Sequence, residues 1–275
     1  MKEKIPAIPA AHQKEGVSPP LSKERIAHCF RQATHTYDLA ATVQQQIGDR
    51  LLNLAGQCAD IRYGRVLEIG CCTGMLTEML CRRHPVTTLF VNDLVSDFAQ
   101  AVLARIPGDR RPEVHPLFGD IEALPLPPNL DLIVSSATFQ WLFDLPAFLP
   151  RLALALNDDG FLAFSIFGPG TLAEFTELTG VGLNYLHPEQ IGDLLARHFI
   201  LEHQVTIRDQ LFLPSPRHVL HHLRDTGVGG VREYRWSSST LKRFEREYTT
   251  RFGTTEGVPG VPVSYTSTSY IARKR

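Results

Sequence analysis

The chain has 275 residues, of which 43% are hydrophobic and 21% charged, a balance typical of a globular protein large enough for a substantial core. Its 28 Lys and Arg residues nearly match its 29 Asp and Glu residues, and its apolar runs are far shorter than the roughly 20 residues of a membrane helix, so we expect no nucleic-acid or membrane partner. The five cysteines form no Cys-x-x-Cys pair and no secretory signal is visible, so we expect a reduced, cytoplasmic protein.

The N-terminal part predicts a leader followed by helices. Residues 1–20 mix prolines, small residues and charges without apolar periodicity, which is typical of a flexible leader. Apolar residues at helical spacing follow Ser22, and a second helical pattern runs over 43–54 and ends before Gly56. We therefore expect residues 21–60 to form a helical cap.

After residue 64, short apolar segments alternate with helical patterns. The expected strands are 65–70, 87–93, 113–120, 130–137 and 160–168. The expected helices are 75–84, 94–106 and 144–156. Strands of near-continuous apolar character, separated by helices at this spacing, indicate an α/β fold with a parallel sheet covered on both faces.

The alternation weakens beyond residue 168. We expect an amphipathic helix at 187–199, a strand at 200–213 and a polar helical insertion at 214–250. Residues 263–275 alternate in the manner of an antiparallel edge strand. The whole indicates one domain over 21–275, with a mostly parallel seven-stranded sheet.

A glycine-containing turn, Glu68-Ile-Gly70-Cys-Cys72-Thr-Gly74, joins the first strand to the next helix. Such a turn alone is a weak signal, because nucleotide, flavin and S-adenosylmethionine sites share it. No Lys-Ser/Thr pair follows, which excludes a P-loop. Asp93 ends the second strand 19 residues after Gly74, where a carboxylate can accept both hydroxyls of a ribose.

A third carboxylate, Asp120, ends the third strand. Asp93 and Asp120 could instead cap turns or helices. Together with Glu68, however, they favour a ligand with cationic character and without phosphates. S-adenosylmethionine, which has a sulfonium, an ammonium and a ribose diol, fits this description better than a dinucleotide.

With these motifs the chain resembles the class I S-adenosylmethionine-dependent methyltransferases, and in particular the malonyl-acyl-carrier-protein O-methyltransferases of biotin synthesis. The resemblance extends from about Lys23 to the C-terminus. Its marks are Phe30, Ala33, Tyr37-Asp38, Ala40, Val43-Gln44, the turn at 67–74, Gly119-Asp-Ile-Glu122, Phe139-Gln140-Trp141, the run at 170–175 and the run at 222–228. The resemblance implies a Rossmann-like class I methyltransferase fold, the cofactor S-adenosylmethionine and the product S-adenosylhomocysteine.

Two positions depart from the family's pattern. Cys72 replaces the middle glycine of the turn, and a side chain there costs about 1–2 kcal/mol if the backbone has a positive φ. Ser136 stands where the family often has asparagine, a difference that we expect to weaken one polar cofactor contact. Neither change removes a carboxylate, so we expect cofactor binding to survive.

The resemblance and the motifs together assign the site residues. We expect the cofactor to be bound by Tyr37, Glu68, Gly70, Cys72, Gly74, Asp93, Leu94, Asp120, Ile121 and Ser136. Tyr37 would close over the cofactor, while Gln140 and Trp141 would line the methyl-transfer pocket. Tyr37 and Trp141 could also be ordinary core aromatics.

Methyl transfer to a carboxylate needs no general base, because the acceptor is already ionised at neutral pH. A malonyl group needs a cation, and an acyl carrier protein is acidic. The segment 217–251 has eight basic and four acidic residues, so it can form a docking patch, although a charged solvated helix is the common alternative. We expect Arg224 to be the substrate-side cation, and we expect no metal at His221-His222.

The leading hypothesis is therefore a carboxyl O-methyltransferase that acts on the malonyl thioester of acyl carrier protein. Its methyl ester would, by the family resemblance, prime the synthesis of a pimeloyl chain for biotin. One alternative is a methyltransferase for another small carboxylate or a quinone-like ring. A second, from another class, is a binding or assembly protein with this fold and no activity.

Overall fold

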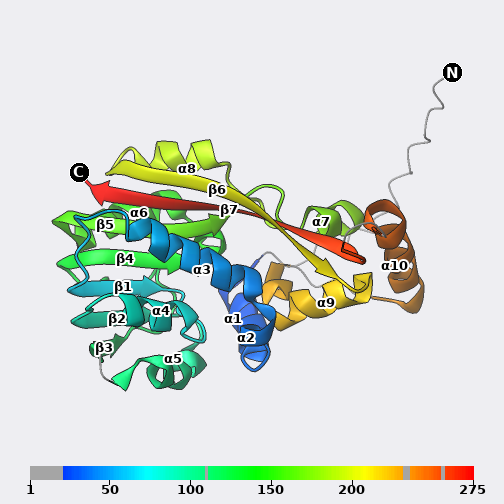
Figure 1. Ribbon diagram of the computed structural model, residues 1–275, viewed down its shortest axis with the longest axis horizontal. Helices are drawn as coiled ribbons and strands as arrows, with labels where there is room; N and C mark the ends of the chain where they lie inside the picture. Colours follow the sequence, from blue (N-terminus) through cyan, green and yellow to red (C-terminus); the bar gives the residue numbers. More distant parts are fainter. Residues whose placement is uncertain (1–20, 109–110, 232–235, 255–257) are drawn as a thin grey trace.

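The computed structural model describes residues 21–108, 111–231, 236–254 and 258–275, so the expected leader at 1–20 lies outside the described residues. The strands are β1 (Arg65–Ile69), β2 (Thr88–Asn92), β3 (Glu113–Pro116), β4 (Leu130–Ser136), β5 (Leu156–Phe167), β6 (Phe199–Leu213) and β7 (Val261–Lys274). The helices are α1 (Lys23–Ala33), α2 (Tyr37–Ala40), α3 (Thr42–Ala55), α4 (Met75–Arg83), α5 (Ala99–Arg105), α6 (Leu145–Ala155), α7 (Ala173–Thr179), α8 (Pro188–Leu195), α9 (Pro216–Asp225) and α10 (Ser238–Phe252). Figure 1 shows their arrangement.

The seven strands form one sheet in the order β3-β2-β1-β4-β5-β7-β6. β7 pairs antiparallel with both β5 and β6, and the remaining pairs are parallel. The prediction of a mostly parallel seven-stranded sheet with one antiparallel strand is confirmed. The C-terminal strand is not at the edge, however, because β6 lies outside it, and its four successive Ser and Thr residues at 266–269 are all buried.

Successive side chains of the strands point to opposite faces and fill two cores. On one face, Val66 of β1 shares a core with Leu80 of α4 and with residues of α3 and α5. On the other, Leu67 shares a core with Leu149 of α6 and with residues of α8. The near-continuous apolar character of the strands therefore reflects burial on both sides, as expected for a parallel sheet.

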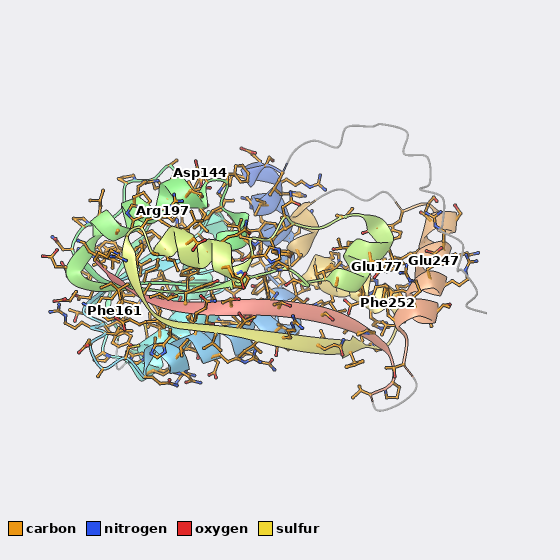
Figure 2. The ribbon with its side chains drawn as sticks, turned by 90° about the horizontal axis from the view of Figure 1, so that it is seen from above. Asp144, Phe161, Glu177, Arg197, Glu247 and Phe252 are labelled. Carbon is orange, nitrogen blue, oxygen red and sulfur yellow. The ribbon has the colours of Figure 1, made fainter. Side chains whose placement is uncertain are left out.

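The long strands β6 and β7 extend past the sheet and carry a lobe made of α7, α9 and α10 (Figure 1). This lobe has its own core, in which Val219 of α9 and Tyr248 of α10 join Tyr265 of β7. Seen from above, Glu177, Glu247 and Phe252 of the lobe lie at the end of the molecule opposite Phe161 (Figure 2). The insertion predicted at 214–250 is helical in its described part.

The N-terminal helices pack against two different parts of the molecule. α3 packs on the sheet, whereas α1 and α2 lie against the lobe, where α1 contacts α9 and the 3-10 turn at Val228–Val231. Gly227, just before that turn, has φ of 72°, and a Cβ there would lie 2.8 Å from the ring of Phe30 in α1. A glycine at this position therefore allows the lobe and α1 to pack closely.

Candidate active site

A large cavity lies at the carboxyl ends of β1, β2 and β4, beneath α1 and α2. This main cavity encloses about 660 Å³, a size suited to a small ligand, and it lies at the edge of the sheet where open α/β sheets bind ligands. Nine of the predicted site residues line it: Tyr37, Gly70, Cys72, Asp93, Leu94, Asp120, Ile121, Ser136 and Trp141. The structure thus brings together residues from positions 37 to 141.

The two glycines of the turn have different tasks. Gly70 has φ of 76° and lines the main cavity, and a Cβ there would clash with the side chain of Thr138. Gly74 has φ of 88° and precedes α4, and a Cβ there would lie 2.9 Å from the backbone of Val102 in α5. Gly74 is not among the residues that line the main cavity, and its lack of a side chain allows α4 and α5 to pack closely; its predicted cofactor contact stays a prediction.

Cys72 occupies a position that ordinarily favours glycine. Its φ is 47°, in the left-handed region, so the strain that the sequence made conditional on a positive φ is present. Its backbone N–H donates a 2.9 Å hydrogen bond to Oδ2 of Asp93, and its side chain lines the main cavity. Burial raises the pKa of the thiol well above its ordinary value, which makes it a poor nucleophile.

Asp93 lies directly after β2 and is 9% exposed. Its Oδ1 accepts a 2.8 Å hydrogen bond from the backbone N–H of Val95, so it caps the turn as well as lining the main cavity. Burial raises the pKa of this carboxyl to about 6. Each carboxylate oxygen has a second lone pair, so Asp93 can still accept two hydroxyl donors from a ligand.

Asp120 lines the main cavity beside a residue that the sequence analysis missed. Lys23, the first residue of α1, also lines the cavity, and its Nζ lies 3.2 Å from Oδ1 of Asp120. Lys23 forms a second ion pair with Glu122. The side-chain amide of Asn92 donates to the backbone of Gly119 at 3.1 Å, which fixes the loop before Asp120. A single lysine near the start of a helix carries no sequence signal that would have linked it to Asp120.

Glu68 does not face the main cavity. It is fully buried, with Oε2 accepting a 2.6 Å hydrogen bond from the hydroxyl of Thr77 in α4. Its other oxygen has no partner among the described residues, and burial raises its pKa to about 7. Because side chains alternate along β1, Glu68 points beneath α4, so two of the three predicted carboxylates line the cavity.

A second chamber of about 370 Å³ adjoins the main cavity, and Phe30, Tyr37, Ala137 and Trp141 line both. The rings of Phe30 and Trp141 meet edge to face, 5.7 Å between centroids. α2, which carries Tyr37, is fixed to the turn by a 2.6 Å hydrogen bond from the hydroxyl of Thr73 to Asp38. Tyr37 and Trp141 are thus both buried, and both lie between the main cavity and the second chamber.

Gln140 lines the second chamber but not the main cavity. Its amide N–H donates to the backbone oxygen of Ala137. Arg224, the predicted substrate-side cation, lines neither space. Its side chain is 67% exposed and its Nε lies 2.8 Å from Asp225. The reason is that α9 buries Val219 and His222 and turns Arg224 to the solvent.

The paired histidines of α9 do not belong to a metal-binding cluster within the described residues. Among the residues that the structure describes, no three His, Cys, Asp or Glu side chains are grouped so as to hold a metal ion. His222 instead forms a 2.6 Å hydrogen bond with the hydroxyl of Tyr265. Across the same described ranges, no helix has both the length and the apolar character needed to cross a bilayer.

Comparisons with known proteins agree with this geometry. Residues 67–164 match the model of a methyltransferase domain. Among solved structures, the [4+2]-cyclase SpnF (TM-score 0.59, 16% identity, 94% of this chain and 98% of that one) and the N-methyltransferase NodS from Bradyrhizobium japonicum (TM-score 0.52, 15% identity, 87% and 98%) share the fold. The Rossmann-like class I methyltransferase fold is thereby confirmed.

Curated relatives are more specific. A malonyl-[acyl-carrier protein] O-methyltransferase from Chlorobium phaeovibrioides is 37% identical over 255 residues, which are 92% of this chain and 97% of the relative. A protein of the same name from Haemophilus ducreyi is 37% identical over 241 residues, 86% and 93% of the two chains. Since identity at this level extends over nearly the whole of both chains, this chain belongs to the malonyl-[acyl-carrier protein] O-methyltransferase family.

Proposed function

We propose that this protein transfers a methyl group from S-adenosylmethionine to the free carboxylate of a malonyl group on acyl carrier protein. The observation that carries the proposal is the arrangement of two adjoining spaces, with Tyr37 and Trp141 between them, in a chain of this family. One space suits the cofactor and the other the acceptor. The methyl ester would then serve as the primer for a pimeloyl chain in biotin synthesis.

The residues of the main cavity fit S-adenosylmethionine. Asp93 would accept the two ribose hydroxyls, and its buried charge would be stabilised by these donors. Leu94 and Ile121 would provide apolar surfaces for the adenine ring, and Asp120 would accept from its amino group. Gly70, Cys72 and Ser136 would surround the methionine part, with Glu68 and Gly74 supporting the turn from behind.

The chemistry asks little of the protein beyond orientation. The bound cofactor supplies an electrophilic methyl group on a sulfonium. The malonyl carboxylate is ionised at neutral pH, so no side chain has to remove a proton. Tyr37 and Trp141, with Gln140 beside them, would align the two reactants and exclude water. Since an anion and a cation react to give neutral groups, a space shielded from water favours the reaction.

The acidic carrier protein would dock on the lobe. Six basic side chains of α9 and α10 are exposed in the described part of the chain: Arg217, Arg224, Lys242, Arg243, Arg246 and Arg251. Three of them have acidic neighbours, since Arg217 pairs with Glu245, Arg224 with Asp225 and Arg251 with Glu177. Arg224 thus fits a docking role better than a grip on the carboxylate, and a positive patch would guide the carrier to the lobe.

The test is methyl transfer from labelled S-adenosylmethionine to malonyl-acyl-carrier protein, beside free malonate and malonyl-coenzyme A. We expect the carrier-bound malonyl group to be labelled fastest. Preferred labelling of a free acid or a quinone would favour a different acceptor. Cofactor binding without labelling of any acceptor would favour a binding protein. A cytoplasmic location, where its five free cysteines would stay reduced, is part of the proposal.

A further inference from the structure

Two hollows lie in series beyond the main cavity. The second chamber meets the main cavity at Phe30, Tyr37, Ala137 and Trp141. On its other side it meets an outer chamber of about 410 Å³ at Thr171, Leu172, Leu183, Tyr185 and Val228. The outer chamber is bordered by Gly182 and Gly229, which are both exposed. Adjoining hollows therefore run from the surface of the lobe to the main cavity.

The described residues that line the second and outer chambers are all uncharged. His222 lies behind the second chamber, where burial lowers its pKa, so the imidazole is neutral near pH 7. Its hydrogen bond to Tyr265, which lines the chamber, fixes the orientation of that hydroxyl. An anion in the second chamber would consequently meet neutral dipoles instead of the cation that the sequence predicted.

Two glutamines that line the second chamber have amide oxygens without a hydrogen-bond partner among the described residues. Gln44 of α3 is 8% exposed, and its buried Oε1 has no hydrogen bond within the described ranges. Oε1 of Gln140 is also buried and without a partner there. Buried polar atoms are ordinarily paired, so two unpaired amide oxygens in one chamber point to a ligand with polar groups. A half turn of the Gln44 amide would present its N–H groups instead.

The geometry points to the second chamber as the site of the acceptor's carboxylate, held by neutral donors with Gln44 foremost. The outer chamber then admits the uncharged arm that carries the acyl group. This inference rests on the proposed function and names the acceptor site within it. A lone pair of the carboxylate forms the new O–CH₃ bond, the S–CH₃ bond breaks with its electron pair going to sulfur, and no proton moves.

A neutral site suits this reaction for a physical reason. The charges of carboxylate and sulfonium diminish as the methyl group moves between them. An arginine would stabilise the ionised carboxylate more than the transition state, and so would raise the barrier. Neutral hydrogen-bond donors orient the carboxylate and replace its water at a smaller cost in reactivity.

The first test is a pair of substitutions at Gln44. We expect Gln44→Met to raise the KM for malonyl-acyl-carrier protein about tenfold, and Gln44→Glu, which adds a repelling charge, to raise it further. Gln46→Met, at an exposed position of the same helix, is the control and should change neither the KM for malonyl-acyl-carrier protein nor the Kd of S-adenosylhomocysteine. Because Gln44 also borders a hollow beside the glycine turn, the Kd of S-adenosylhomocysteine must be measured as well, and it should stay within about twofold of that of the unaltered protein.

The second test blocks the passage. A Cβ at Gly229 would meet no atom of the described residues within 4 Å, and Gly229 lines the outer chamber, so Gly229→Trp places a bulky side chain at its border. We expect kcat/KM for malonyl-acyl-carrier protein to fall at least about tenfold, with the Kd of S-adenosylhomocysteine and the thermal midpoint unchanged.

The outcomes separate the two proposals. An unaltered protein that methylates no malonyl thioester refutes the proposed function and this inference with it. An active protein in which both Gln44 variants keep their KM and kcat overturns the acceptor site alone. So does a weaker cofactor Kd with an unchanged acceptor KM, because Gln44 would then serve the cofactor.

Discussion

Replacing Asp93 by asparagine tests the cofactor assignment most directly. A hydrogen bond to a charged group contributes about 1.5–3 kcal/mol and one between neutral groups about 0.5–1.5 kcal/mol. Asparagine keeps one acceptor oxygen and loses the charge, so we expect binding of S-adenosylhomocysteine to weaken by about 2–4 kcal/mol, or about 30- to 1,000-fold in Kd. Asp93→Ala, which leaves no acceptor, should weaken it at least as much.

The structural effect of Asp93→Asn can be separated from its effect on binding. The carboxylate accepts from the backbone N–H groups of Cys72 and Val95, and asparagine can satisfy one of them. The loss of the other is offset, because the variant no longer buries a charge whose pKa is raised to about 6. We therefore expect the free energy of unfolding at pH 7.5 to change by no more than about 2 kcal/mol.

The assay is titration of S-adenosylhomocysteine by calorimetry, with urea unfolding as the stability measurement. Asp97→Asn is a matched control, since Asp97 follows β2 closely but is half exposed and pairs with Arg31. In the unaltered protein, affinity should fall below about pH 6 as Asp93 takes up a proton, whereas the variant should lack this dependence. A folded variant with Kd within about threefold of the unaltered protein would refute the assignment of Asp93.

Three further substitutions have defined outcomes. Cys72→Gly should keep or raise methyl-transfer activity. Its stability should change little, because relief of about 1 kcal/mol of backbone strain in the folded state is balanced by the larger unfolded-state entropy of glycine. Loss of activity in a folded variant would reveal a function of the thiol. Burial raises the pKa of Glu68 to about 7 in the folded protein, whereas the carboxyl ionises near pH 4.5 in the unfolded chain. The unfolding free energy of the ligand-free protein should therefore fall as pH rises from about 4.5 to 7. Glu68→Gln should remove that decline and stabilise the protein by about 2–4 kcal/mol at pH 8, and urea titrations with equal pH profiles would contradict this. Arg224→Ala should raise the carrier KM about two- to fivefold, less so in high salt, with the cofactor Kd constant; the reverse pattern would exclude its docking role.

The strands that run under helices were predictable because local sequence determines them. Apolar runs fixed β1 to β5 within a few residues, apart from the shorter β3 and the earlier start of β5. β7 was predicted at the edge because its mixture of polar and apolar residues resembles the half-solvated pattern of an antiparallel edge strand. In the sheet, Thr268 is instead buried and bonded to Thr206 of β6, which a single strand's pattern cannot reveal.

Some residues of the candidate site could also be predicted from the local sequence, and others could not. Asp93 and Gly70 were predictable, since the turn between a strand and a helix constrains both the backbone and the position of the next strand's end. The positions of Lys23 and Gln44 beside the cavities were not, because they depend on how α1 and α3 pack against the rest of the fold. Glu68 was assigned to the site for its type, whereas the alternation of β1 turns it to the opposite side.

The fold by itself does not determine the reaction, since a [4+2]-cyclase shares it with methyltransferases. Beyond the main cavity, this chain has the lobe of α7, α9 and α10, which packs against α1 at Gly227 and borders the second and outer chambers. The basic side chains of α9 and α10 are exposed, while the described residues that line the second and outer chambers are uncharged. If both proposals hold, the exposed cations would attract an acidic carrier and the uncharged chamber would orient the reacting carboxylate, so different residues would serve binding and reactivity.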